Sequence, residues 1–282
     1  MFELFSMPFF VNSLLSVVVM SVLTGIIGSY VVSRKLVFMS GGISHASFGG
    51  LGIAWFLGFN PMLGAFVFGI FSALSIEFIS SRGKSEKDTA IGILWSVGMA
   101  IGILFIFLTP GYQPNLMSYL FGNILVVPRS EIVFGAVLTF GIVILFVVFY
   151  KPILYVAFDR EFALVRRMPV KTVNYLMMVV VALAIIMTMK VAGIILAIAM
   201  FTLPPVIASL FCTKLSRMMI ASVIVGVVGS VAGLFLSFLF NTPTSATIVF
   251  TLGVIYLVVK GCCATIWRYL KSNLEYRRRN IS

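Results

Sequence analysis

The chain has 282 residues, of which 61% are hydrophobic and only 10% are charged, and its formal net charge is +12. An average soluble domain carries about 25% charged residues and could not bury so much apolar surface in one core. The composition therefore excludes an ordinary soluble protein and predicts a chain that lies mostly in a lipid bilayer.

Long stretches without charged side chains alternate with short basic segments. A helix that crosses the bilayer needs about 20 apolar residues, so the longest stretches must turn back once, at Asn60-Pro61 and near Pro243. Continuous apolarity without alternation favours helices over a β-barrel. We therefore predict a single all-α transmembrane domain over residues 1–282, a polytopic bundle of eight or nine spans. The nine candidates are residues 9–31, 44–59, 62–80, 90–109, 131–150, 173–189, 191–211, 218–239 and 244–260.

Lysine and arginine predict the orientation. With nine spans and an outer N-terminus, only Arg129 and Lys190 lie outside, and 18 of the 20 basic residues lie in the cytoplasm. Such a bias is typical of plasma-membrane proteins, and it predicts a cytoplasmic C-terminus. The alternative of eight spans, left open because span 44–59 is short and rich in glycine, breaks the bias. We expect the basic tail at 277–279 to contact anionic membrane lipid rather than nucleic acid.

Two segments interrupt the plain pattern. Residues 116–127 form an apolar patch, bounded by prolines, that is too short to span, and we expect an outer half-helix there. Residues 153–167 mix charged, aromatic and aliphatic side chains between Pro152 and Pro169, which predicts a short amphipathic helix at the inner face.

Two small-residue patterns predict close helix packing. Gly98 and Gly102 are four residues apart within one span, and Gly229 and Gly233 repeat that spacing in another. Such pairs put small residues on one helix face, so neighbouring backbones can approach closely.

The sequence has no visible catalytic machinery. The run Gly83-Lys84-Ser85 lacks the earlier glycine of an ATP-binding P-loop, and a single histidine cannot build a zinc-protease site. Glu77 is the only acid well inside an apolar run, although secondary transporters usually bury more ionisable groups. We therefore expect a protein that is not itself an enzyme and binds no cofactor tightly.

One polar cluster stands out, between Ser40 and Gly50, with His45 at its centre. An imidazole at bilayer depth is costly unless it faces a cavity or a partner, and it is a common ligand of transition metals. Ser44 and Ser47 could add oxygen ligands. The residues leave two hypotheses open: a transient metal site, or a histidine that is hydrogen-bonded inside the bundle.

Several motifs resemble the membrane permease subunits of ABC-type importers for zinc, manganese and iron(II). The match runs in order over nearly the whole chain. Its motifs are SGGISHASFGGLGI from Ser40, SEKDTAIGILWSVGMAIG at 85–102, LMSYLFGNIL at 116–125, FDREFALVRRMPV at 158–170 and VAGIILAIAMFTLPPVIASL at 191–210.

The resemblance implies a division of labour. Two copies of the permease form the pathway, two ATPase subunits dock on the cytoplasmic side, and an extracytoplasmic binding protein delivers the metal. Residues 158–170 match the coupling region of the family, which implies that Phe158, Asp159, Glu161 and Phe162 contact the ATPase.

His45 matches a family histidine and is thereby a candidate transient metal ligand. Many members carry an aspartate four residues earlier, where this chain has Gly41, so the site is less charged. We expect import of a divalent metal by alternating access, with zinc favoured. The alternatives are manganese or iron(II) in the same kind of importer, or a stand-alone secondary metal transporter.

Overall fold

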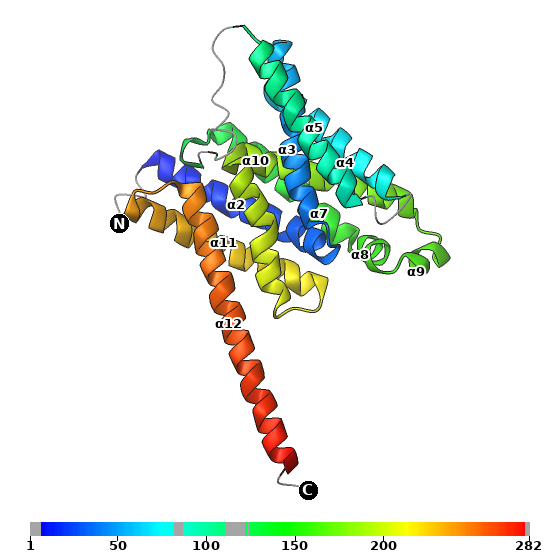
Figure 1. Ribbon diagram of the computed structural model, residues 1–282, viewed down its shortest axis with the longest axis vertical. Coiled ribbons are helices and arrows are strands. Elements are labelled where there is room, and N and C mark those ends of the chain that lie inside the picture. Colours follow the sequence, from blue (N-terminus) through cyan, green and yellow to red (C-terminus); the bar gives the residue numbers. More distant parts are fainter. Residues whose placement is uncertain (1–6, 82–86, 111–121, 123, 280–282) are drawn as a thin grey trace.

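The computed structural model describes residues 7–81, 87–110, 122 and 124–279. These residues form helices and connecting turns without any β-strand (Figure 1). The helices are α2 (Pro8–Ser33), α3 (Val37–Phe56), α4 (Pro61–Ser80), α5 (Lys87–Leu108), the 3-10 turn η2 (Ile124–Val126), α7 (Arg129–Val148), α8 (Tyr150–Phe158), α9 (Arg160–Val165), α10 (Val170–Ser209), α11 (Leu215–Phe240) and α12 (Thr244–Arg279).

Within the described ranges, seven helices are long and apolar enough to cross a membrane: α2, α4, α5, α7, α10, α11 and α12. The all-α polytopic fold is thus confirmed. Seven is fewer than the eight or nine spans that we predicted. Two of the predicted spans lie in the single helix α10, and α3 is not among the seven.

The helix α3 differs from its predicted span. It begins at Val37 and ends at Phe56, whereas we predicted a span over 44–59. Five glycines, three serines and His45 lower the hydropathy of this helix. For this reason its first two turns were not recognised from the apolar pattern. At 20 residues it is about 30 Å long, close to the thickness of the hydrocarbon core.

The helix α10 joins two predicted spans without a loop. Its 40 residues run from Val170 to Ser209 and are interrupted only at Gly193, where φ is 80° and ψ is 167°. Lys190, which we expected in an outer loop, lies inside this helix and forms an ion pair with Glu131 of α7 at 3.2 Å. Because Glu131 neutralises its charge, the lysine side chain does not need to lie in an aqueous loop.

The predicted turns end their helices as the sequence suggests. Asn60 caps α4, because its Oδ1 accepts a hydrogen bond from the Met62 amide at 3.0 Å, and Pro61 takes the first helical position. Asn241 ends α11 in the left-handed conformation, with φ of 51°.

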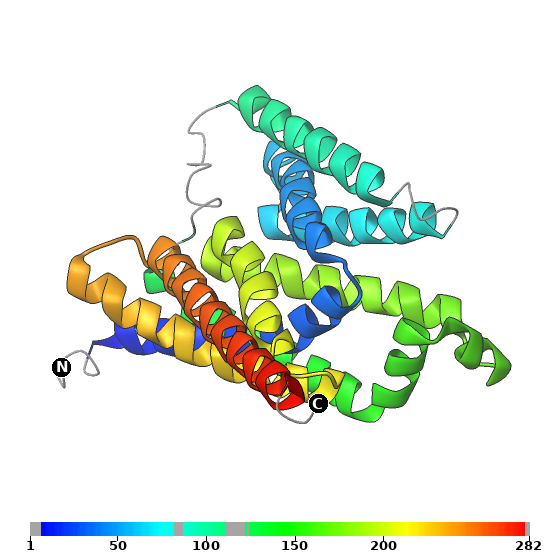
Figure 2. The same cartoon turned by 60° about the horizontal axis from the view of Figure 1, so that its bottom comes forward.

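Glycines bring α3, α4 and α5 into close contact. A Cβ on Gly50 of α3 would overlap the carbonyl of Gly64 of α4, and Gly98 and Gly102 of α5 lie against the backbone of α3. Gly229 and Gly233 of α11 likewise lie against Leu252 and Ile248 of α12. Both small-residue patterns are therefore confirmed as helix-packing surfaces, and Figure 2 shows the three helices α3, α4 and α5 as one group.

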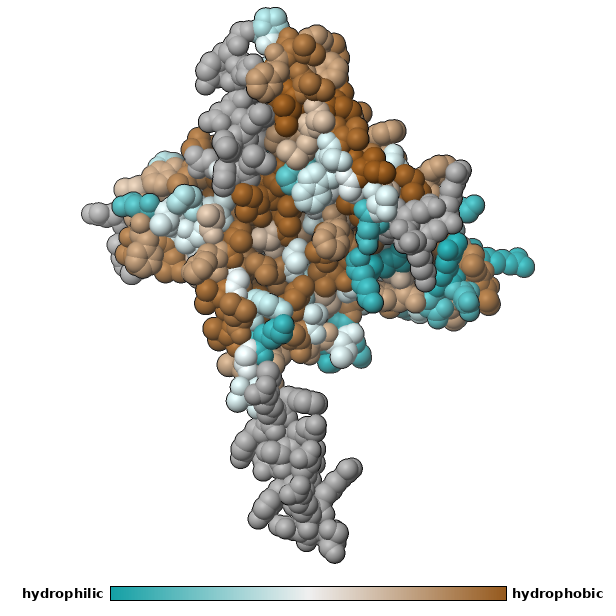
Figure 3. All heavy atoms as spheres, viewed as in Figure 1, coloured by the Kyte–Doolittle hydropathy of each residue, from teal (hydrophilic) through white to brown (hydrophobic). Residues whose placement is uncertain are grey.

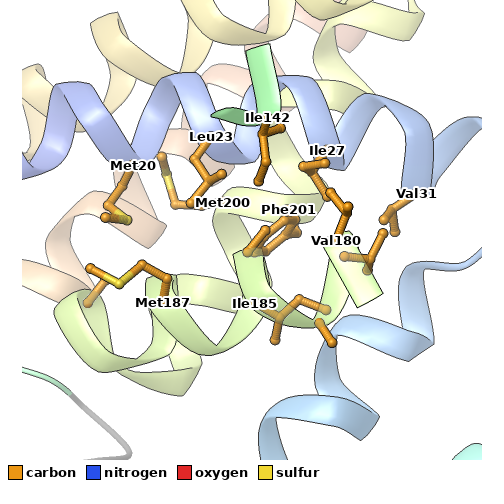
Figure 4. Close-up of a cluster of buried hydrophobic side chains, with 14 of the residues drawn as sticks. Met20, Leu23, Ile27, Val31, Ile142, Val180, Ile185, Met187, Met200 and Phe201 are labelled. Atoms are coloured by element: carbon orange, nitrogen blue, oxygen red, sulfur yellow. The ribbon is translucent and has the colours of Figure 1, made fainter. Parts of the chain in front are cut away.

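The core of the bundle forms where α2 packs against α10, α11 and α7. Its buried side chains include Leu23 and Ile27 of α2 and Ile185 and Phe201 of α10 (Figure 4). Most of the face in Figure 3 is hydrophobic, and hydrophilic residues gather at its right edge, where α8 and α9 lie. This distribution fits a body surrounded by lipid.

The expected outer half-helix falls mainly outside the described residues. Of residues 116–127, the structure describes 122 and 124–127, and Ile124–Val126 form a single 3-10 turn. That turn lies against α2, where Ser13 Oγ donates a hydrogen bond to the Ile124 carbonyl at 3.1 Å.

Candidate functional site

His45 lies on α3 with its ring against α5. The imidazole stacks on the indole of Trp95, with 4.3 Å between ring centroids and 11° between ring planes. Its Nδ1 atom is buried and has no hydrogen-bond partner among the residues that the structure describes, so within these residues it does not make the bond that a purely structural histidine requires. A buried polar atom without a partner is costly, and a ligand at this ring would offset that cost.

Gly41 lies one turn before His45 and faces the same indole. A Cβ atom added at Gly41 would lie 3.0 Å from Cζ3 of Trp95 and 3.6 Å from Cδ1 of Ile198. Trp95 thus crowds this position, and an acidic side chain here would require the indole to shift. The aromatic ring forms the wall of the site on that side, and sequence spacing gave no signal for it.

Ser44 and Ser47 do not join His45. Both side chains are fully buried, and their hydroxyls donate to the carbonyls of Ser40 and Ile43, each at 2.7 Å. A Cβ added on Gly69 of α4 would lie 2.6 Å from the Ser47 oxygen. Since successive helical residues are about 100° apart, that serine faces nearly opposite to the histidine. The structure brings His45 and Trp95 together and leaves both serines on other faces of α3.

A resident metal centre is not visible in the described part of the chain, where no group of three or more His, Cys, Asp or Glu side chains could hold an ion. A groove of about 540 Å³ lies elsewhere, between α2, α7 and α11, and its lining is apolar apart from Tyr150 and Ser216. Among the described residues, His45 is therefore not part of a cluster of three or more such side chains that could hold a metal.

The predicted amphipathic helix over 153–167 is two helices. Asp159 separates α8 from α9 with φ of −136° and ψ of 78°, and its carboxylate accepts a hydrogen bond from the Phe162 amide at 2.9 Å. Aspartate favours such an N-cap over a helix interior, because its side chain can satisfy a free amide there. The single-helix prediction was wrong for this reason.

The two short helices fold against each other at the edge of the molecule (Figures 1 and 2). Tyr155 and Phe162 are in ring contact at 4.9 Å, and Arg166 lies over the Phe162 ring at 5.3 Å. Buried Val156, Ala163 and Val170 form a small core between α8, α9 and the start of α10. Asp159 and Phe162 therefore help to fold this pair of helices.

Other side chains of α8 and α9 point outward. Phe158 is 52% exposed, Leu164 55% and Val165 82%, and Glu161 is exposed as well. Leu164 and Val165 were not among the ATPase contacts that we predicted. The sequence does contain a signal for them, because two adjacent aliphatic residues stand out in a charged segment. These four residues form the outward face of the α8–α9 pair.

The sequence matches the ABC 3 transport family over residues 6–262, which is most of the chain. It belongs to the ABC 3 transport family. The manganese transport system membrane protein MntC of Listeria monocytogenes is 32% identical to this chain over 250 residues, 89% of this chain and 89% of the relative. The manganese import system permease protein ScaB of Streptococcus gordonii is 33% identical over 269 residues, 95% of each.

A solved structure extends the likeness to the fold. PsaBC from Streptococcus pneumoniae, in complex with Fab, matches with a TM-score of 0.79 and 32% identity over 90% of this chain and 91% of that chain. The ABC 3 chain described here is therefore a multi-pass membrane permease of a metal-transport family.

Proposed function

We propose that this chain is the permease subunit of an ATP-driven importer that moves a divalent transition metal, with manganese as the main cargo, across the cytoplasmic membrane. Two copies form the pathway and alternate between outward and inward access. Membership of the ABC 3 family, over most of the chain, carries this proposal. A stand-alone secondary transporter is the less favoured candidate, because it gives α8 and α9 no partner.

His45 is the proposed transit contact for the metal. The Trp95 ring holds the imidazole from one side, and the unpartnered Nδ1 leaves the ring with unused binding capacity. With one nitrogen from each copy and no carboxylate at Gly41, the site binds weakly, which suits passage rather than storage. Water supplies the remaining ligands.

Manganese replaces zinc as the favoured cargo. Ligand chemistry alone does not choose manganese, since imidazole suits zinc and oxygen ligands suit manganese. The relatives named for manganese, MntC and ScaB, support it, and neither of them is named for zinc. Iron(II) is the remaining alternative.

The outward face of the α8–α9 pair is the proposed contact for a separate ATPase subunit. Phe158, Leu164 and Val165 offer an apolar centre and Glu161 a charged rim, the usual composition of a helix that docks in a groove. Asp159 and Phe162 stay part of the proposed region through their role in shaping it. In this proposal α8 and α9 lie in the cytoplasm, the N-terminus lies outside, the C-terminus lies inside, and a metal-binding protein delivers cargo from outside.

The test is elemental analysis of metal-starved cells that lack the chain, complemented with the wild type, His45→Ala or Ser96→Ala. Ser96 is exposed on α5, beside Trp95, and bonds back to its own helix, so it is a matched control. We expect manganese to fall in the deletion, to return with the wild type and Ser96→Ala, and to stay low with properly inserted His45→Ala. If no divalent metal changes, the importer proposal is wrong. If complementation with the wild type restores only zinc or only iron, manganese is rejected as the cargo.

A further inference from the structure

Arg34 connects the end of α2 to the end of α8. Its Nη1 donates hydrogen bonds to the carbonyls of Ala157 at 2.6 Å and Val156 at 3.3 Å. These carbonyls lie in the last turn of α8, where no further helical amide is available to them. A guanidinium at a helix C-terminus is also favoured by the helix dipole, so Arg34 caps α8 immediately before the break at Asp159.

On the other side, Arg34 belongs to a tight junction between α2 and α3. The amides of Arg34, Lys35 and Leu36 donate to the carbonyls of Tyr30, Val32 and Val31 at 3.0, 3.0 and 2.8 Å. Lys35 takes the left-handed conformation, with φ of 57°. This hydrogen-bond pattern is a Schellman motif. The first turn of α3 follows at once, since the Met39 amide bonds to the Leu36 carbonyl at 2.9 Å. Because this junction is short and hydrogen-bonded, a displacement of Arg34 would also move the start of α3.

The same helix α3 carries His45, eight residues after its first residue, Val37. That separation is about 12 Å along the helix axis. The α8–α9 pair, held together by its own small core, lies at one end of this path and the proposed metal-transit residue at the other. The neighbouring Lys35 side chain is exposed, so it offers a nearby positive charge for comparison.

We propose that Arg34 is the positioning residue that links movement of the α8–α9 pair to the orientation of α3 and His45, so that ATP hydrolysis is coupled to metal release. The inference rests on the proposed function. A cap that only stabilised α8 would alter the amount of folded protein. A coupling link alters, in addition, how much metal each hydrolysed ATP moves.

The experiment compares the wild type with Arg34→Gln, Arg34→Lys and Lys35→Gln in proteoliposomes that hold the assembled permease and ATPase, with the binding protein outside. Lys35→Gln removes the neighbouring positive charge and leaves the Arg34 bonds to α8 in place. Manganese uptake and ATP hydrolysis are measured on the same samples, normalised to assembled complex. We expect Arg34→Gln to hydrolyse ATP and to move about tenfold less manganese per ATP, the scale of one lost charge-assisted hydrogen bond.

We expect Arg34→Lys to fall between Arg34→Gln and the wild type, and Lys35→Gln to match the wild type. If assembled Arg34→Gln moves as much manganese per hydrolysed ATP as the wild type, the inference is overturned. If Arg34→Gln does not assemble, Arg34→Lys decides the question: a wild-type ratio overturns the inference and a reduced ratio supports it. Absence of ATP-driven uptake by the wild type would instead reject the proposed function itself.

Discussion

The indole of Trp95 lies nearly parallel to the imidazole of His45 and also covers Gly41, one helical turn earlier. The two residues come from different helices, α5 and α3, that glycines bring together. The aromatic ring therefore has two roles: it stacks on the only histidine of the chain, and it crowds the position, one turn earlier, where a carboxylate would lie.

Replacing Gly41 by aspartate tests this steric relationship. Its Cβ would lie 3.0 Å from the Trp95 ring, and overpacking of this kind costs about 1–3 kcal/mol. We expect Gly41→Asp and Trp95→Ala each to lower thermal stability in detergent. The double variant should be more stable than the sum of the two effects predicts, by about 0.5–3 kcal/mol. Strictly additive effects would contradict the packing described.

The serines beside His45 should be dispensable for transport. Both hydroxyls already donate to carbonyls of their own helix, and Ser47 faces α4. We expect cells with Ser44→Ala or Ser47→Ala to accumulate manganese as the wild type does, unlike cells with His45→Ala. Metal content measured on equal amounts of inserted protein decides the matter. A loss as deep as that of His45→Ala would return the serines to the metal path.

Asp159 should act as a helix cap rather than as a charge. Its Oδ1 accepts from the Phe162 amide, a role that asparagine can fill. We expect Asp159→Asn to keep ATPase binding, whereas Asp159→Ala loses about 0.5–2 kcal/mol of local stability and binds the ATPase more weakly. Co-purification of the ATPase with each variant distinguishes the two roles. Equal weakening by Asn and Ala would point to a direct ionic contact.

Val165 should be central to ATPase docking. It is 82% exposed at the end of α9, so an acidic replacement leaves the fold intact while placing an unpaired charge in an apolar contact. We expect Val165→Asp to reduce the co-purified ATPase about tenfold or more, the usual scale for a central interface residue. The matched control is Lys171→Gln, an exposed change at the start of α10. Undiminished co-purification with Val165→Asp would exclude this face.

Gly193 should resist substitution. Its φ of 80° and ψ of 167° are accessible only to glycine at low cost, and an alanine there is strained by about 1–3 kcal/mol. Ser245 adds a hydrogen bond to the Ala192 carbonyl at 3.2 Å, which fixes the kink from α12. We expect Gly193→Ala to lower thermal stability clearly. In contrast, Gly141→Ala should not lower it, since an added Cβ there meets no atom of the described residues within 4 Å.

Hydropathy is enough to predict most of the fold. Apolar length alone places α2, α4, α5, α7 and α11 to within a few residues of their observed bounds. It fails at α3, whose glycines serve close helix contact rather than lipid exposure. It also fails at the middle of α10, where the charge of Lys190 suggests a loop. The ion pair with Glu131 is a tertiary contact and leaves no trace in local sequence.

The site is only partly predictable. His45 stands out by its rarity, but its neighbour Trp95 is 50 positions away on another helix, and no spacing rule connects them. The bond from Arg34 to Ala157 spans 123 positions and is equally invisible in the sequence. In α8 and α9, composition predicts an amphipathic segment. It does not reveal that Asp159 ends one helix and begins the next, because an aspartate can either lie inside a helix or cap one, and local sequence does not decide between the two.

The most direct test of the central claim is manganese flux into proteoliposomes that contain this permease with its ATPase subunit, with the metal-loaded binding protein outside. The proposal predicts manganese accumulation that requires both ATP and the binding protein, and that His45→Ala abolishes while Ser96→Ala does not. Accumulation that proceeds without ATP, or no accumulation of any divalent metal in the complete assembly, would contradict it.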